Sequence, residues 1–316
     1  MPPLNAQGGV MLSMKKRSTR KAIILGAAFA IASTVLAGCA TGAGDKAADK
    51  APSKTADSTL AAMLPADIRE AGVLKVGTEA FYPPFEYLDA DNTTVVGLDM
   101  ALFNAIGAEL GLKVKVTNMA FDGLLPALDA KRIDVVVAAM TDTTARQAKY
   151  DFVDYFLTGQ GIVVPAGNPK NVKTVEDMCG LKVAALEGST QVSLLEKFNT
   201  EECSGNPITV TALATDADAM LQVHSGRADA SFSQDAVARY NAQAEGGKGK
   251  FEIGNDQPLL PVLMGPMFGK DDAELRDTVQ ATVEKLIANG TYQSILDEHD
   301  LGSGAVTDVT VNGGTL

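Results

Sequence analysis

The sequence predicts an α/β fold made of two units, and three observations indicate it. The run 133–139 is too continuously apolar for a sheet with one wet face, so it predicts a strand covered on both sides. Predicted strands and helices alternate in two successive rounds, a pattern typical of parallel sheets with right-handed crossovers. The 316 residues, with 46% apolar and 21% charged residues, suit a globular chain of two domains.

The first round begins beyond residues 41–60, which contain almost nothing large and apolar to offset the entropy of ordering the chain. We expect this stretch to be a flexible tether, and folded structure to begin near Leu64. In chain order the pattern then predicts a helix at 66–70, a strand at 74–77, a helix that starts at Asp99 and stops at Gly111, a strand at 113–116, a helix capped by Asp122, and the strand at 133–139.

The second round follows an extended segment at 159–169. It ends in another extended segment at 259–268 and two helices, so the chain predicts two lobes with a late return. The elements expected in this half are strands at 182–186, 208–212 and 228–232, and helices at 191–198, 216–225, 235–243, 271–288 and 291–298.

The N-terminus carries an export signal. Five basic residues between Lys15 and Lys21 precede an uncharged run at 22–36, which is too short for a comfortable membrane span. The run ends in Leu-Ala-Gly-Cys, which resembles the lipobox of bacterial lipoproteins, whose cysteine, here Cys39, is lipidated after cleavage. A plain secretory signal or a signal anchor is the alternative, and Met1, Met11 and Met14 remain open as the start.

The charge balance excludes a class of partners. Residues 1–38 hold five of the 27 Lys and Arg and none of the 39 Asp and Glu, so the rest of the chain carries a formal charge of −17. Phosphate binding requires clustered Lys and Arg, so we expect no nucleic-acid partner and no attraction to anionic lipid.

Cysteine and histidine usage predicts a disulfide and no metal. With Cys39 assigned to the lipobox, Cys179 and Cys203 form an even pair in an exported, oxidising setting, and we expect them to be bonded. Two free buried thiols are the alternative. His224 and His299 are far apart and neither lies at metal-ligand spacing from another ligand, so no metal site and no cofactor are expected.

A candidate carboxylate site follows the apolar strand at 133–139. Thr141, Thr143 and Arg146 come after its C-terminal end. Ligands of open α/β sheets lie outside the carboxyl ends of strands, and a guanidinium there can hold a carboxylate through two parallel charge-assisted bonds. The alternative is a surface arginine paired with Asp142 or Asp151.

Several blocks resemble a known family, the extracellular solute-binding proteins that deliver polar amino acids to ABC transporters. The resemblance implies a type II periplasmic-binding-protein-like fold, in which the chain crosses to a second lobe and returns through hinge strands near 161–165 and 259–263. The blocks are KVGTEAFYPPFEY (75–87), GLDMALFNAIGAELG (97–111), TDTTAR (141–146), DFVDYF (151–156), GRADASFSQD (226–235) and NGTYQSIL (289–296).

The resemblance also implies divisions of the chain. The expected parts are a signal peptide at 1–38, a tether at 39–62, the first part of lobe one at 63–163, lobe two at 164–259, the return segment of lobe one at 260–302, and a C-terminal tail at 303–316.

The family's carboxylate clamp falls on Arg146, with the Thr141 hydroxyl and the backbone amide near Ala139 completing it. Its second-lobe acid, which takes the ligand's α-ammonium, falls at the end of ADASFSQD. Strict register places Gln234 there, but we expect Asp235 to take this role because an ammonium needs a full negative charge to offset its desolvation. A helix cap is the alternative for Asp235.

Five more positions correspond to the family pocket. Tyr82 and Phe121 match its aromatic wall, and Glu79 matches an acid that meets the ligand side chain. Leu186 and Thr190 flank a helix N-terminus, where free amides and the helix dipole favour a carboxylate. The alternatives are core packing for Phe121, a solvated strand end for Glu79 and a helix cap for Thr190.

The implied function is that of a lipid-anchored substrate-binding protein of an ABC importer at the outer face of the bacterial cytoplasmic membrane. We expect a monomer that is not an enzyme, touches the membrane through its lipid alone, and passes a polar or basic amino acid (arginine, lysine, histidine or glutamine) to permease subunits. The alternative is an enzyme of the cyclohexadienyl or arogenate dehydratase type on the same fold. No Ser-His-Asp, Cys-His or metal-ligand constellation favours it.

Overall fold

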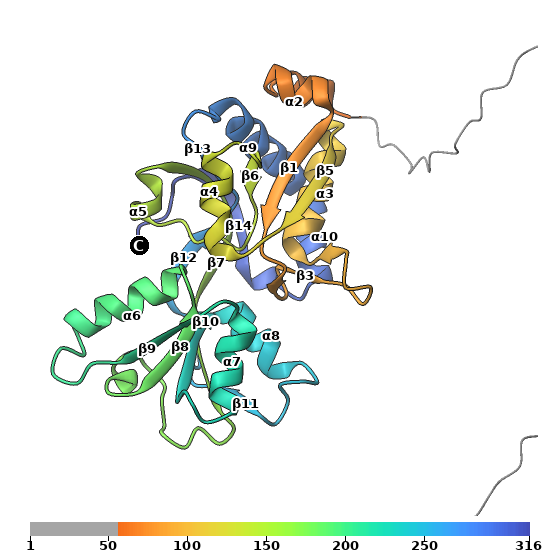
Figure 1. Cartoon of the computed structure of the whole chain (residues 1–316). Coiled ribbons are helices and arrows are strands. Elements are labelled where there is room, and N and C mark those ends of the chain that lie inside the picture. The colour runs from red at the N-terminus through yellow and green to blue at the C-terminus, as the bar shows by residue number, and fades with distance from the viewer. Residues whose placement is uncertain (1–55) are drawn as a thin grey trace, which may run out of the picture. The chain divides into compact units, whose positions relative to one another are not determined.

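The computed structural model describes residues 56–316, which form two α/β lobes joined by extended strands (Figure 1). The predicted signal peptide and Cys39 lie outside the described residues. Folded structure begins earlier than predicted, because α1 (Ser58–Ala62) lies within the expected tether and the Asp57 side chain caps it. Among residues 56–316 no helix is both long and apolar enough to cross a bilayer.

The first lobe, in the upper half of Figure 1, combines residues from both parts of the chain. Its strands lie in the order β5–β1–β6–β13, with β1 parallel to β5 and β6, and β13 antiparallel to β6. A small sheet of β2, β3 and β4 lies beside it. The bounds are α2 (Ala66–Ala71), β1 (Val73–Thr78), β2 (Phe81–Tyr82), β3 (Glu86–Leu88), β4 (Val95–Val96), α3 (Leu98–Leu110), β5 (Lys113–Asn118), α4 (Leu124–Asp129), β6 (Val135–Val136), α5 (Thr144–Gln147), β13 (Met267–Gly269), α9 (Ala273–Ala288) and α10 (Thr291–Glu298).

The second lobe is built from the middle of the chain and appears in green and cyan in Figure 1. Strand β8 lies between β10 and β9 and is parallel to both. Its buried strand residues pack with α6 in a core of their own, which includes Leu195 and Phe198. The bounds are β8 (Lys182–Leu186), α6 (Thr190–Thr200), β9 (Thr209–Leu213), α7 (Asp216–His224), β10 (Ala230–Gln234), α8 (Asp235–Gln243) and β11 (Phe251–Ile253).

One long strand, β7 (Tyr150–Pro165), runs through both lobes. Its first part pairs with β13, and its last part pairs with β10 and β11. The return strand β12 (Leu259–Met264) is antiparallel to the middle of β7, with Leu259 opposite Gln160 and Met264 opposite Phe156. The two connections between the lobes are therefore hydrogen-bonded to each other.

The segment expected as a C-terminal tail at 303–316 contains a strand. Strand β14 (Ala305–Val311) pairs with β7, placing Thr310 opposite Asp154 and Val311 opposite Val153. The Asp154 carboxylate accepts a hydrogen bond from the Thr310 hydroxyl at 2.8 Å, which holds this strand against the first lobe.

Two local predictions need correction. The apolar strand expected at 133–139 is shorter: β6 spans Val135–Val136, the Asp134 and Val137 amides on either side donate to β1, and the chain turns at Ala139, whose φ of +43° lies in the left-handed region. Asp122 does not cap the helix that follows it, since α4 has no side-chain cap. The predicted stop of α3 at Gly111 is confirmed by its φ of +70°.

The expected disulfide is confirmed between Cys179 and Cys203, with an S–S distance of 2.01 Å. It joins the turn before β8 to the segment after α6, and Cys203 is buried in the core of the second lobe. A bridge that closes a loop of this size typically stabilises a fold by roughly 2–4 kcal/mol.

Candidate ligand-binding site between the two lobes

A cavity lies between the lobes. Most of its lining follows the carboxyl ends of strands: Glu79 after β1, Thr141 and Arg146 after β6, Leu186 at the end of β8, and Gln234 at the end of β10. The full lining is Glu79, Tyr82, Glu86, Phe121, Ala138, Ala139, Thr141, Arg146, Leu186, Ser189, Thr190, Gln191 and Gln234.

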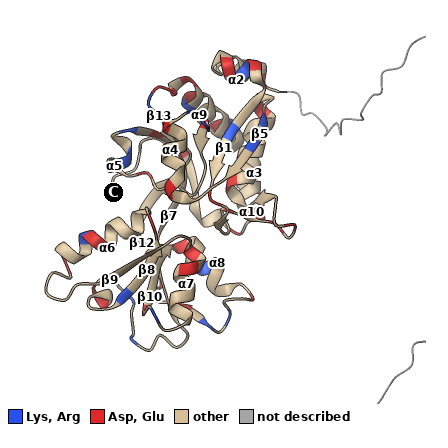
Figure 2. Ribbon diagram, in the orientation of Figure 1, with Lys and Arg blue, Asp and Glu red and all other residues tan. Residues whose placement is uncertain are grey.

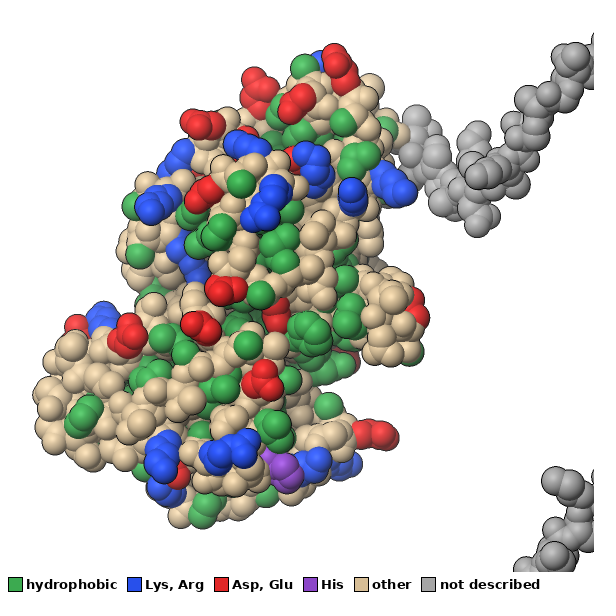
Figure 3. All heavy atoms as spheres, viewed as in Figure 1, with side chains coloured by type: hydrophobic (Ala, Val, Ile, Leu, Met, Phe, Trp, Pro, Cys, Tyr) green, Lys and Arg blue, Asp and Glu red, His purple; other side chains and the backbone are tan. Residues whose placement is uncertain are grey.

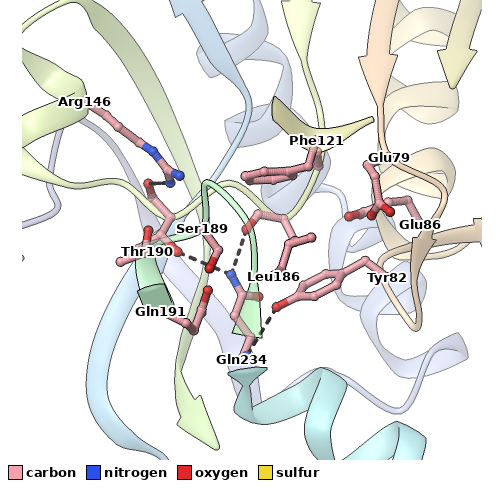
Figure 4. Close-up of a pocket in the computed structure, with 13 residues that line it drawn as sticks. Glu79, Tyr82, Glu86, Phe121, Arg146, Leu186, Ser189, Thr190, Gln191 and Gln234 are labelled. Atoms are coloured by element: carbon pink, nitrogen blue, oxygen red, sulfur yellow. Dashed lines mark hydrogen bonds between the residues drawn. The ribbon is translucent and has the colours of Figure 1, made fainter. Parts of the chain in front are cut away.

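Arg146 lies at one end of this cavity (Figure 4). Its Nη1 donates to the Thr141 carbonyl at 2.9 Å, and its Nη2 approaches the Gly188 carbonyl of the second lobe at 3.5 Å. Within residues 56–316 no carboxylate comes within ion-pair distance of this guanidinium. Burial lowers the pKa of Arg146 to about 10, so the side chain stays charged at neutral pH without a fixed counter-ion.

Neither alternative partner proposed for Arg146 forms an ion pair with it. The Asp142 carboxylate accepts from the Gln147 side chain and from the Gly314 amide, and thus holds the C-terminal segment. Asp151 is ion-paired with Arg276 and with Lys270, each at 2.6 Å.

The N-terminus of α6 faces the same end of the cavity. The Ser189 side chain caps the helix by accepting from the Val192 amide, so Thr190 is the first helical residue and not the cap. Gln191 is buried and donates from Nε2 to the Gln160 side chain at 2.6 Å. The free amides and positive dipole end of this helix favour an anion beside Arg146.

The backbone amide of Ala139 is not available to a ligand, contrary to expectation. It donates to the buried Asp99 carboxylate at 3.0 Å. The Ala139 carbonyl accepts from Gln234 Nε2 at 2.7 Å, and the same nitrogen lies 3.3 Å from the Thr141 hydroxyl. The Gln234 side chain of the second lobe is therefore the hydrogen-bond donor to both groups.

Gln234, and not Asp235, faces the cavity. Asp235 is the first residue of α8. Arg239, one turn further along the helix, donates from Nε to its carboxylate at 2.7 Å, and the Asn255 side chain donates at 3.1 Å. The prediction that favoured Asp235 is corrected on this geometry, because its charge is already paired one helical turn away. Gln234 is 2% exposed, and its Oε1 has no hydrogen-bond partner among the described residues.

The opposite end of the cavity is acidic (Figure 4). Glu79 and Glu86 are 3% and 1% exposed, and each has one carboxylate oxygen without a partner in the described part of the chain. Burial raises the pKa of Glu79 to about 7, and the nearby Asp216 carboxylate of the second lobe adds to the shift. Burial and then the charge of Asp99 raise the pKa of Glu86 well above its usual range. Glu79 is thus the acid more readily ionised toward the cavity.

Asp216 brings a second-lobe acid to this end. It is 1% exposed at the start of α7, its Oδ1 has no partner among residues 56–316, and burial raises its pKa to about 6. Because Glu79 belongs to the first lobe, two like-charged groups approach each other where the lobes meet.

Apolar side chains separate the two charged ends (Figure 4). Tyr82, Phe121 and Leu186 line this middle part. The Tyr82 hydroxyl lies 3.3 Å from the Ser233 hydroxyl and accepts from the backbone amide of Gln234 at 3.3 Å. These contacts join the two lobes. Phe121 also packs against the first-lobe core, so the core interpretation of this residue is partly right.

Sequence reasoning missed Glu86, Ala138, Ser189 and Gln191. A usable signal existed for Glu86, because it is the direct cross-strand partner of Tyr82 in the β2–β3 hairpin. Gln191 directly follows Thr190 at the α6 N-terminus. Nothing local marks its contact with Gln160, which lies 31 positions away on β7.

Charged residues are distributed over the surface as well as in the cavity (Figure 3). Basic and acidic residues are interspersed along the chain in both lobes (Figure 2). In the space-filling view, acidic and hydrophobic side chains lie along the boundary between the lobes (Figure 3). In the described part of the chain no three His, Cys, Asp or Glu residues are grouped as metal ligands would be.

Comparison with known proteins places this chain among binding proteins. Residues 74–302 match the model of the family described as bacterial extracellular solute-binding proteins, family 3. The arginine-binding protein ArgT of Corynebacterium glutamicum is 26% identical over 256 residues, which cover 80% of this chain and 82% of that protein.

Two solved structures share the fold. Both are of an ancestral arginine-binding protein at 34% identity. The arginine-bound form covers 72% of this chain and 98% of its own with a TM-score of 0.67, and the glutamine-bound form covers 73% and 98% with a TM-score of 0.66.

These similarities confirm the predicted type II periplasmic-binding-protein-like fold. They also confirm the prediction that the chain is not an enzyme, because these relatives are binding proteins. The chain belongs to the bacterial extracellular solute-binding proteins, family 3.

Proposed function

We propose that this protein captures a basic or polar amino acid between its lobes and delivers it to the permease subunits of an ABC importer. The observation that carries the proposal is the charge arrangement of the cavity. A guanidinium without a carboxylate partner lies at one end, and carboxylates with unpaired oxygens lie at the other. A molecule with an acid at one end and a cation at the other would satisfy both.

The relatives support the same ligand class. ArgT is named for arginine, and the ancestral arginine-binding protein holds arginine in one structure and glutamine in another. In this chain the buried Glu79 favours a cation over an amide at the far end, because only a charge offsets the desolvation of an ionised carboxylate. We therefore expect arginine, lysine or histidine to bind more tightly than glutamine.

Closure of the lobes would couple binding to transport. Tyr82, Thr141 and Arg146 of the first lobe form hydrogen bonds with Gln234 and Gly188 of the second. A ligand that bridges the two lobes adds to these contacts and shifts the population toward the closed form. Only that form presents both lobes together to a permease.

A thermal-shift panel of the twenty amino acids tests the proposal. A ligand present at about 100 times its dissociation constant should raise the free energy of unfolding by about 2.7 kcal/mol. We expect the largest rise in melting temperature with a basic amino acid and little or none with aspartate or glutamate. A melting temperature that no amino acid changes would refute the proposed ligand class.

We also propose that the protein is held at the outer face of the cytoplasmic membrane by a lipid on Cys39. The support is the Leu-Ala-Gly-Cys ending of the export signal. Tethering would keep the protein near its transporter and raise its effective concentration there. Metabolic labelling with a radioactive fatty acid should label the protein, and Cys39→Ser should abolish the label and release the protein from membranes. An unlabelled wild-type protein would contradict the anchor.

A further inference from the structure

We infer that the cavity selects carboxylic acids that carry a distal cation and that it does not require an α-ammonium group. The preferred class then includes ω-guanidino and ω-amino acids as well as the basic amino acids. The inference rests on the proposed function, since it concerns the same cavity and the same carboxylate partner, Arg146.

The acceptors beside Arg146 already accept hydrogen bonds from the protein. An α-ammonium next to a clamped carboxylate needs hydrogen-bond acceptors there. The two that the first lobe offers, the Ala139 carbonyl and the Thr141 hydroxyl, both accept from Gln234 Nε2, at 2.7 and 3.3 Å. The side-chain amide of Gln234 thus competes with an ammonium for both acceptors.

No carboxylate compensates for a positive charge at this position. Of the thirteen residues that line the cavity, only Glu79 and Glu86 are acids, and both lie at the end away from Arg146 (Figure 4). Asp235 is adjacent in sequence but is held by Arg239 and Asn255. An ammonium buried near Gln234 would therefore lose its hydration without gaining an ion pair, which is unfavourable.

Gln234 Oε1 is an acceptor at this end that a ligand can still use. It is buried and has no partner among residues 56–316. As a neutral acceptor it can take one hydrogen bond from an ammonium or from a hydroxyl, and it does not distinguish the two by charge. A substituent at the α-position is tolerated in this arrangement, but its charge contributes little.

The end of the cavity away from Arg146 offers a ligand cation both an acid and a free acceptor oxygen. Glu79 is an acid, is 3% exposed, and has an oxygen without a partner in the described chain. The Asp216 carboxylate approaches it from the second lobe, so the closed state brings two acids together. A distal cation removes this repulsion and pairs a buried charge, so most of the discrimination between ligands should come from here.

Isothermal titration with four related ligands tests the inference on the purified protein. The ligands are L-arginine, 5-guanidinopentanoate, which lacks the α-amino group, agmatine, which lacks the carboxylate, and L-norvaline, which lacks the distal cation. We expect 5-guanidinopentanoate to bind within about tenfold of arginine. Agmatine and norvaline should each bind at least about a hundredfold more weakly, because each leaves one buried charge unpaired.

A gain-of-function variant gives the matched test. Gln234→Asp supplies a charge and removes the amide donors, so arginine should become preferred over 5-guanidinopentanoate by a further tenfold or more. Asp235→Asn, at the next position, changes one charge outside the cavity and should leave the ratio of the two affinities unchanged even if it lowers the melting temperature.

The outcomes separate this inference from the proposed function. If arginine binds and 5-guanidinopentanoate binds more than about a hundredfold more weakly, the inference is wrong while amino-acid binding stands. Norvaline binding as tightly as arginine would also overturn it. If none of the four ligands binds and the panel of amino acids is silent as well, the proposed function itself fails.

Discussion

Replacing Arg146 by alanine is expected to weaken the binding of carboxylate ligands by at least about a hundredfold. Among the described residues that line the cavity, Arg146 is the only cation, and no carboxylate of the described chain is paired with it. Each charge-assisted bond that it donates to a ligand carboxylate should contribute roughly 1.5–3 kcal/mol, and two parallel bonds are possible. Titration of the variant with the best ligand of the wild type measures the loss.

Two control variants make this result specific. Arg146→Lys keeps the charge but loses the planar fork, so it should recover only part of the affinity. Arg227→Ala removes an exposed arginine whose Nε donates to the Gln222 side chain in the second lobe, and it should bind as the wild type does. Unchanged affinity in Arg146→Ala would remove the basis for placing the ligand's carboxylate at this end.

Affinity for a cationic ligand is expected to fall on acidification. Burial and the Asp216 charge raise the pKa of Glu79 to about 7, so this carboxyl is mostly neutral below that value. If binding requires the ionised form, affinity should drop by about thirtyfold between pH 8 and pH 5.5, following the ionised fraction. Titration with arginine across this range measures the effect, and a flat profile would show that Glu79 does not receive the cation.

Variants of the two acids separate their contributions. Glu79→Gln should bind arginine weakly at all pH values and flatten the profile. Asp216→Asn removes the second-lobe charge that raises the pKa of Glu79, so the fall in affinity should move to lower pH. Glutamine, which carries no distal charge, should show a much smaller dependence on pH with the wild type.

The unliganded protein should show the opposite trend in stability. The folded-state pKa values of Glu79 and Asp216, about 7 and about 6, exceed the ordinary values of 4.5 and 3.8. The folded state therefore binds more protons than the unfolded state in this window, and the contribution of these groups is lost as the pH rises toward 7. A bound cationic ligand offsets this loss, because it pairs with the ionised form.

Local signals predicted the secondary structure well where neighbours in sequence determine it. Strand β8 and helices α8 and α10 have the bounds that hydrophobic periodicity and turn residues indicated. The strand predicted at 133–139 was too long, because β6 covers Val135–Val136 and the chain then turns at Ala139, which lines the cavity together with Thr141. Strand β14 was missed, since its order depends on β7, some 150 positions earlier.

The site was predicted only in part, and charge explains the error. Sequence reasoning chose Asp235 over Gln234 because a cationic ligand group requires an acid. That argument is sound for a buried ammonium, but it could not show that Asp235 is neutralised by Arg239. The prediction of the acidic end of the cavity was also incomplete, since Glu86 was not identified and Asp216 was treated only as part of a helix.

The sequence by itself determined the two α/β units, the order of their elements, the cysteine pair and the placement of Arg146 after a buried strand. These follow from periodicity, turn residues and residue type, which are local properties of the chain. Only the tertiary structure decided which charges are already paired and which face the cavity. Pairing depends on distances between groups up to about 170 positions apart, such as Gly314 with Asp142, and no local pattern encodes such distances.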